Sequence, residues 1–113
     1  MIHENDTLHF FLDTGANSSQ LSRKYIETHK EEIVAHAKLQ HVHRGGAGGM
    51  VEVDEYVIDD FTYIIGSQSN TLKHMPVSMD ESHSQYEGVI GQDIFAQFDT
   101  MILNFRYMYI DFE

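Results

Sequence analysis

The sequence predicts a mostly β protein, either a small barrel-like all-β unit or an α+β fold in which strands dominate. After residue 37 the chain consists largely of short runs rich in Val, Ile, Tyr and Phe, bounded by glycine or polar turns. Only two stretches indicate helices. The chain, 1-113, has 113 residues, which is room for one domain with one modest core.

The N-terminal third predicts a short hairpin, a buried strand and a helix. The apolar run "TLHFFL" (7–12) indicates a strand that is buried on both faces near the centre of a sheet. A turn signal at Asn5 and Asp6 predicts that residues 2–4 pair back as a short strand. Ser22 is a good N-cap for the helix that follows. The apolar stripe of that helix comprises Ile26, Ile33 and Ala37.

The middle of the chain predicts a long hairpin and two further strands. The segments "KLQHVH" (38–43) and "MVEVDEYVI" (50–58) flank the glycine-rich "RGGAGG", whose glycines suit a hairpin tip. "FTYIIG" (61–66) and "TLKHMPVSM" (71–79) indicate two more strands, separated by the loop "SQSN".

The C-terminal part predicts a strand, a short helix and a second hairpin. "YEGVIGQDIFAQF" (86–98) combines an apolar strand, a glycine turn and a short helix, for which Asp93 is the expected N-cap. "TMILNFRYMYIDF" (100–112) predicts two strands joined by a tight turn near Arg106.

Composition excludes several classes of function. The net charge is −11, from 18 acidic residues against 7 Lys and Arg, whereas nucleic acids and anionic membrane surfaces require basic patches. The absence of cysteine excludes disulfides, thiol catalysis and cysteine-type zinc sites. No segment approaches the roughly 18–20 apolar residues of a membrane span. We therefore predict neither a nucleic-acid partner nor a membrane span.

The stretch "HFFLDTGANSSQLS" (9–22) contains the candidate catalytic residue. Asp13 follows an apolar run directly, although an ionised carboxylate is costly to bury unless something compensates its charge. Gly15 allows a sharp backbone turn and the close approach of another group. From these residues alone, Asp13 is either an ordinary turn residue at a strand end or a placed catalytic group.

Three pieces of the chain, in this order, resemble the retropepsin-like (retroviral-type) aspartic proteases, particularly their bacterial single-lobe relatives. "FFLDTGANSSQLS" (10–22) is similar to the catalytic loop of that family, and "RGGAGGMVEV" (44–53) to its glycine-rich flap and return strand. "GVIGQDIF" (88–95) is similar to the segment that packs beside the catalytic loop and leads into a short helix. Together the three pieces span roughly residues 8 to 105.

The resemblance implies a small closed β-barrel lobe of acid-protease type, with one or two short helices and Asp13 at its open edge. In this family two lobes meet, and each supplies one Asp of a pair that shares a proton and activates a water to cleave a peptide bond. The implied partners are a peptide or protein substrate and a second lobe, with no cofactor. The implied site residues are Asp13 as catalyst, Thr14, Gly15 and Ala16 in the catalytic loop, Gly45, Gly46, Ala47, Gly48 and Gly49 in the flap, and Val89, Ile90 and Gly91 in the turn beside the loop.

The second Asp must come from another lobe, because the sequence contains no second Asp-Thr-Gly or Asp-Ser-Gly. Either a homodimer supplies Asp13 of its mate, or a tandem lobe lies outside this chain. Members of the family carry a further strand before the catalytic loop, so we expect the chain to be a fragment, the C-terminal half, of a longer protein. The bacterial resemblance implies an exported, cell-envelope (periplasmic) protein with a signal upstream, while the sequence itself leaves the compartment open.

Two other functions remain open. A non-catalytic peptide-binding or structural module would keep the same fold and groove without chemistry. His41 and His43 lie on one face of a predicted strand and could chelate the metal of a hydrolase, but a zinc site needs a third ligand and the sequence shows no matching motif. We therefore predict no metal site, and "RGGAGG" remains either a flap or a plain loop.

Overall fold

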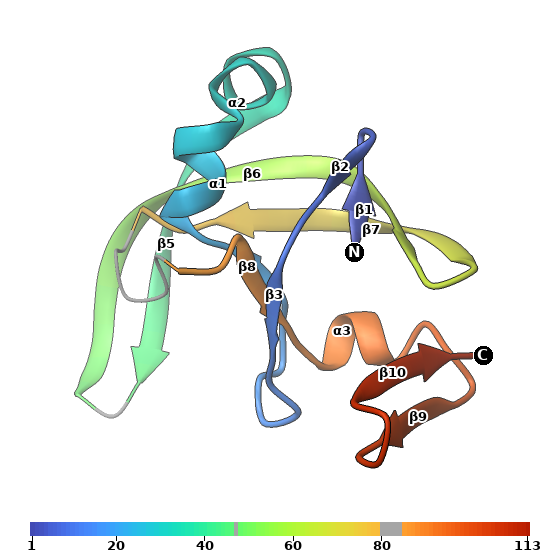
Figure 1. Cartoon of the computed structure of the whole chain (residues 1–113). Helices are drawn as coiled ribbons and strands as arrows, with labels where there is room; N and C mark the ends of the chain where they lie inside the picture. The colour runs from blue at the N-terminus through green and yellow to red at the C-terminus, as the bar shows by residue number, and fades with distance from the viewer. Residues whose placement is uncertain (47, 80–84) are drawn as a thin grey trace.

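The computed structural model describes residues 1–46, 48–79 and 85–113, and about half of the chain lies in strands. Figure 1 shows a strongly curled sheet, with two short helices at one end and a third helix and a separate hairpin at the other. The helices are α1 (Arg23–Thr28), α2 (Lys30–His36) and α3 (Gln92–Phe95). The strands are β1 (Ile2–His3), β2 (Asp6–Thr7), β3 (Phe10–Leu12), β4 (Gln20–Leu21), β5 (Ala37–Gly46), β6 (Gly49–Ile65), β7 (Gln68–Val77), β8 (Gly88–Ile90), β9 (Met101–Asn104) and β10 (Tyr109–Phe112).

The main sheet has the order β2-β1-β6-β7-β4-β8-β3, with β5 paired to β6 off this path. Within the described residues this hydrogen-bonded path runs from β2 to β3 without closing, so the structure shows a curled half-barrel and a closed barrel is not shown. Strand β3 pairs with β8 in parallel, and β8 pairs with β4 antiparallel. The mostly β fold expected from the sequence is confirmed.

Strand β3 differs from its prediction. It lies at the end of the sheet path, not near its centre, and the side chain of Phe11 is 46% exposed. The Phe11 ring contacts Tyr86 at a centroid distance of 6.1 Å. A continuous apolar run was expected to mean burial on both faces, but here one face of β3 is only partly covered by this chain.

Strands β6 and β7 also differ from their prediction. Residues 61–66 do not form a separate strand, because β6 runs unbroken to Ile65 and turns into β7 at Gly66, whose φ is 59°. Pairing between β6 and β7 keeps the same register on both sides of Asp60, which has a φ of 54°. The predicted loop "SQSN" therefore falls mostly within β7. The polar pair at 59 and 60 bends the strand rather than ending it.

The first helix begins at the predicted N-cap position, but the predicted apolar stripe is only partly helical. Ser22 is the N-cap of α1, and Ile33 of α2 is buried in the core. Ala37 already has the extended backbone of β5, so its assignment to the helix was wrong. Tyr25, fully buried on α1, is the large core residue that the predicted stripe did not include.

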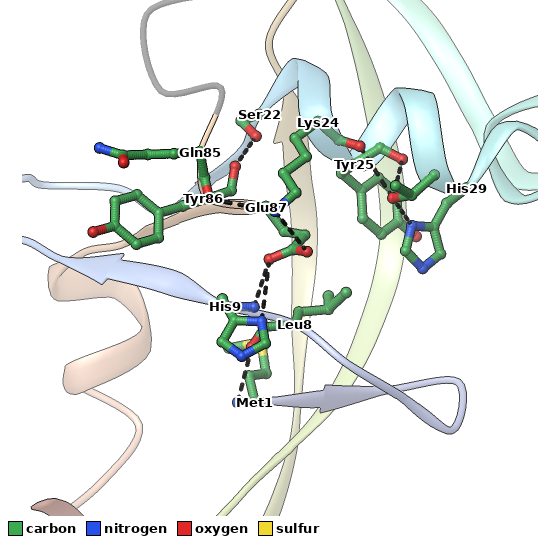
Figure 2. Close-up of polar contacts among 11 residues, drawn as sticks. Met1, Leu8, His9, Ser22, Lys24, Tyr25, His29, Gln85, Tyr86 and Glu87 are labelled. Atoms are coloured by element: carbon green, nitrogen blue, oxygen red, sulfur yellow. Dashed lines mark hydrogen bonds and ion pairs between the residues drawn. The ribbon is translucent and has the colours of Figure 1, made fainter.

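Glu87, only 8% exposed, ties the start of β3, the start of β8 and helix α1 together (Figure 2). Its Oε2 accepts the backbone N–H of His9 at 2.6 Å, and its Oε1 lies 3.7 Å from Nζ of Lys24. Its own backbone N–H donates to the carbonyl of His9, and its carbonyl accepts the N–H of Ser22. A buried carboxylate is tolerated here because a backbone donor and a lysine both compensate its charge.

We expect Glu87→Gln to lower the free energy of unfolding by about 1–3 kcal/mol, because it removes the buried charged acceptor of the His9 N–H. Chemical denaturation measures this change. Glu27→Gln is the matched control, since among the described residues Glu27 makes only an exposed pair with Arg23 on α1 and should change stability by less than about 0.5 kcal/mol. Equal effects of the two substitutions would show that Glu87 does not anchor these elements.

Candidate functional site

Asp13 sits at the point where β3 leaves the sheet. Its backbone N–H donates to the carbonyl of Ile90 at 3.0 Å, one residue beyond the parallel pairing of Leu12 with Ile90. The structure thus brings two of the predicted pieces side by side, the Asp13 loop and the turn that contains Val89, Ile90 and Gly91.

A tight turn follows Asp13. The Oδ1 of Asp13 accepts the N–H of Gly15 at 2.9 Å, and the Asp13 carbonyl accepts the N–H of Ala16 at 3.1 Å. A side chain at position 15 would place its Cβ 3.3 Å from the Asp13 carboxylate, so glycine keeps the carboxylate uncrowded. Asp13 is half-buried and Thr14 is exposed. Asp13 thus lies, half-buried, at the end of a strand that forms the edge of the sheet path.

The far end of the loop is clamped by Ser19 and Asp93. The fully buried Ser19 donates its hydroxyl to Oδ1 of Asp93 at 2.6 Å, and its backbone N–H donates to both Asp93 oxygens, at 2.8 and 3.0 Å. The Ser19 hydroxyl also accepts the N–H of Gly91 at 2.8 Å. A carboxylate that accepts several such bonds fixes loop and helix relative to each other.

Gly91 is needed for close packing rather than for an unusual backbone angle. A Cβ at position 91 would lie 2.8 Å from the carbonyl oxygens of both Ala16 and Ser18, which is impossible without moving the loop. The next residue continues the contact, because Gln92 donates its N–H to Ala16 and its Nε2 to the carbonyl of Thr14.

Asp93 was predicted to be the N-cap of the short helix, and this prediction is wrong. The N-cap of α3 is Gly91, and Asp93 lies inside the first turn, with its carboxylate directed at Ser19 and at the N–H of Ile94. Ser19 itself was not singled out from the sequence. Its partner is 74 residues away, and the available signal was a short hydroxyl residue in the loop together with a carboxylate just after Gly91.

The long β5–β6 hairpin carries the predicted flap glycines. Its register pairs Gly46 with Gly49, and Gly49 has a φ of 101°, in the left-handed region that favours glycine. Gly45 and Gly48 also belong to this tip, while Ala47 lies outside the described residues. In Figure 1 the hairpin tip and the turn after β3 both point toward the bottom of the view.

A pocket connects the Asp13 loop with the base of this hairpin. It has a volume of about 230 Å³. Ser18 of the loop lines it together with Gln40 of β5 and Val57 of β6. Loop and hairpin therefore border one space on the surface.

Carboxylates tie the histidines of the hairpin across its two strands. The Nδ1 of His41 lies 2.5 Å from Oδ1 of Asp54, and its Nε2 lies 3.1 Å from Glu52. His43 pairs with the same Glu52 at 3.4 Å. Hydrogen bonding to Asp54, and then to Glu52, raises the pKa of His41 above its usual range. The predicted chelating pair is thus engaged with carboxylates.

An apolar surface lies on the other side of Asp13. A pocket of about 260 Å³ is lined by Leu12 and by the β9–β10 hairpin. At the turn of that hairpin Phe105 is 80% exposed and Met108 is 82% exposed. The tight turn predicted near Arg106 is confirmed, since Asn104 pairs with Tyr109. Large apolar side chains thus remain uncovered next to the strand that carries Asp13.

No protein-family model matches the chain, and no curated protein matches it. None of the described helices is long and apolar enough to cross a bilayer.

We expect Asp93→Asn to destabilise the protein by about 1–3 kcal/mol, because its amide cannot accept all the donors that Ser19 presents. Thermal and chemical unfolding measure this loss, and faster hydrogen exchange of the Ser19 amide should accompany it. Asp99→Asn is the control, because Asp99 is exposed and close in sequence. Unchanged exchange at Ser19 in Asp93→Asn would contradict the clamp.

We expect the stability of the hairpin to depend on the charge of His41. Since its pKa is raised in the folded state, the stabilisation is fully present below the unfolded value of about 6.5 and is lost as pH rises through the folded pKa. Titration of the histidine ring signals by NMR measures this pKa. Asp54→Asn should lower it, while Asp60→Asn, on the same strand and paired with Lys73, should not. An identical His41 titration in wild type and Asp54→Asn would refute the assignment.

Proposed function

We propose that the chain is one lobe, of acid-protease type, of a retropepsin-like aspartic endopeptidase. The single observation that carries the proposal is the placement of Asp13. It follows a strand directly, on a glycine turn that is clamped at its far end by Ser19 and Asp93. A half-buried carboxylate, on a loop that is fixed at both ends and that lines a pocket together with a glycine-tipped hairpin, suits a catalytic group better than a surface turn.

In the proposed reaction Asp13 acts as half of a pair. Two carboxylates about 3 Å apart cannot both ionise cheaply, so the pair holds one proton between them. The ionised member takes a proton from a water, whose oxygen attacks the scissile carbonyl carbon, while the protonated member donates a hydrogen bond to the carbonyl oxygen. Transfer of a proton to the amide nitrogen then allows the C–N bond to break. The two roles belong to the pair rather than to either residue.

The second carboxylate comes from another lobe, either a dimer mate or a tandem lobe. The apolar surface supports this part of the proposal, because the exposed Phe105 and Met108 line one pocket with Leu12, the residue directly before Asp13. Large exposed apolar patches commonly mark interaction surfaces. A lobe that covered this surface would also cover the exposed face of β3 and would bury Asp13 beside its counterpart. In a C2 dimer the same residue contributes both carboxylates.

The substrate in this proposal is an extended peptide. Such a peptide would lie between the Asp13 loop and the β5–β6 hairpin, where its backbone can pair as an added strand. The glycines at 45, 46, 48 and 49 would let the tip close over it. The pocket lined by Ser18, Gln40 and Val57 would then receive a substrate side chain.

One observation favours the alternative of a non-catalytic peptide-binding module. The Asp13 carboxylate already accepts a hydrogen bond from Gly15, as an ordinary aspartate turn would. Such a module would bind the same extended peptides in the same groove and would not cleave them.

The test is a mixing experiment on the purified chain. Wild type and Asp13→Asn are combined at fixed total concentration, and cleavage of a peptide mixture is followed by mass spectrometry. If two copies of Asp13 form the pair, activity should fall as the square of the wild-type fraction, and light scattering should report a dimer. Asp99→Asn, exposed and outside the loop, should mix without loss.

Other outcomes separate the versions of the proposal. Activity that falls linearly with the wild-type fraction would refute a pair built from two copies of Asp13. A dimer that binds peptides without cleaving them would favour the non-catalytic module. A strict monomer without cleavage would exclude the homodimer and leave the tandem lobe, for which Asp13→Asn in the longer protein is the decisive variant.

A further inference from the structure

A second polar cluster lies where the β1–β2 hairpin meets helix α2, and it shares no residue with the Asp13 site. It contains His3 of β1, Glu4 of the turn between β1 and β2, and Glu32 of α2. Ligand atoms of these three side chains all lie within 4.8 Å of one another. Carboxylates often lie close together on an acidic surface. The buried histidine is what distinguishes this cluster from such surface groups.

His3 is held in one orientation and one tautomer. It is only 4% exposed, and its ring stacks on Phe61 with centroids 4.0 Å apart and planes at 14°. Its Nδ1 lies 2.6 Å from the carbonyl oxygen of Thr62. Because a carbonyl only accepts hydrogen bonds, Nδ1 carries a proton and donates it. In the neutral ring Nε2 therefore presents a lone pair.

That lone pair faces negative charge. The Nε2 atom is fully buried and has no hydrogen-bond partner within the part of the chain that the structure describes. Oε2 of Glu32 lies 4.0 Å from it. A lone pair and a carboxylate repel each other unless a proton or a metal ion lies between them. A histidine that donates one ring N–H to a backbone carbonyl and turns its other nitrogen toward carboxylates is the usual arrangement of a metal ligand.

Tyr25 adds a second buried polar group to the same region. Its hydroxyl is buried and, among the described residues, has no hydrogen-bond partner. Burial, and after it the charges of Glu32, Glu4 and Asp6, raises the pKa of Tyr25 far above its usual range. Of these carboxylates, Asp6 has His29 as a partner, whose Nε2 lies 3.0 Å from its Oδ2. A divalent cation would neutralise the two carboxylates that remain.

We propose that His3, Glu4 and Glu32 bind a divalent metal ion, for which zinc is the best-matched probe. One imidazole nitrogen and two carboxylates form a donor set that zinc accepts, with a fourth position left for water or for the Tyr25 hydroxyl. Ligand atoms on a tetrahedral zinc lie about 3.3 Å apart, so the three side chains, whose ligand atoms lie within 4.8 Å of one another and at 4.0 Å for His3 and Glu32, would draw together around the ion. The ion would join the N-terminal hairpin to α2 and stabilise that end of the sheet.

The test measures zinc binding to the chelator-treated, full chain by titration calorimetry. A background carrying His41→Gln and His43→Gln removes the exposed hairpin histidines as competing sites, and one zinc per chain should still bind. In that background Glu32→Gln should weaken binding by at least about tenfold, since even changes outside the ligand set cost about 10–100-fold. Glu31→Gln, exposed and adjacent on the same helix, should bind as the background does.

Glu4→Asn separates binding from folding. Glu4 has a φ of 50°, in the left-handed region that asparagine tolerates better than most residues, so this variant should fold at least as well without metal. Zinc should raise the midpoint of thermal unfolding of the background protein and should no longer do so in Glu4→Asn. The result does not depend on His3 variants, which could fail to fold because the ring is buried.

Two results would overturn the proposal. One is zinc binding of unchanged strength and stoichiometry in both Glu32→Gln and Glu4→Asn, which would place the ion elsewhere. The other is a midpoint of thermal unfolding of the background protein that zinc does not raise.

Discussion

The clamp between Ser19 and Asp93 is the constraint on which the Asp13 site depends. Strand β3 is only three residues long and lies at the edge of the sheet, so its pairing with β8 alone would leave the following loop free to move. The Asp93 carboxylate fixes the far end of that loop, and the missing side chain of Gly91 lets the loop pack directly on the start of α3. Asp13 is thus held from both sides.

This rigidity contrasts with the hairpin on the other side of the shared pocket. The β5–β6 ladder is regular as far as the pairing of Gly46 with Gly49, and its tip is rich in glycine, which costs the most entropy to order. Histidine and carboxylate side chains cross-link its strands below the tip, where His41 bridges Asp54 and Glu52. In the function proposed above, this glycine-rich tip would close over a peptide held against the Asp13 loop.

Local patterns in the sequence predicted the elements whose partners are close along the chain. The hairpin around "RGGAGG" and the turn near Arg106 follow from neighbouring residues. Ser22 lies at the predicted N-cap position, but its hydroxyl donates to the carbonyl of Tyr86 and does not cap the helix. The errors concern distant partners. Asp93 has the composition of a helix cap, but Ser19 competes for its carboxylate from 74 residues away. The apolar run of β3 resembles a central strand, and nothing local reveals that one of its faces is left largely uncovered by this chain.

Several carboxylates of this acidic chain pair with histidine side chains. With 18 acidic residues and only 7 Lys and Arg, many carboxylates must find other partners. His74 pairs with Asp59 at 2.6 Å and His29 with Asp6 at 3.0 Å, so part of the surface pairing strengthens when imidazole is protonated. His3 differs from these histidines because it is buried. Its Nδ1 is committed to a backbone carbonyl and its ring is buried, so its remaining nitrogen cannot reach water. The zinc ion proposed above would lie between this nitrogen and the Glu32 carboxylate, which is 4.0 Å away.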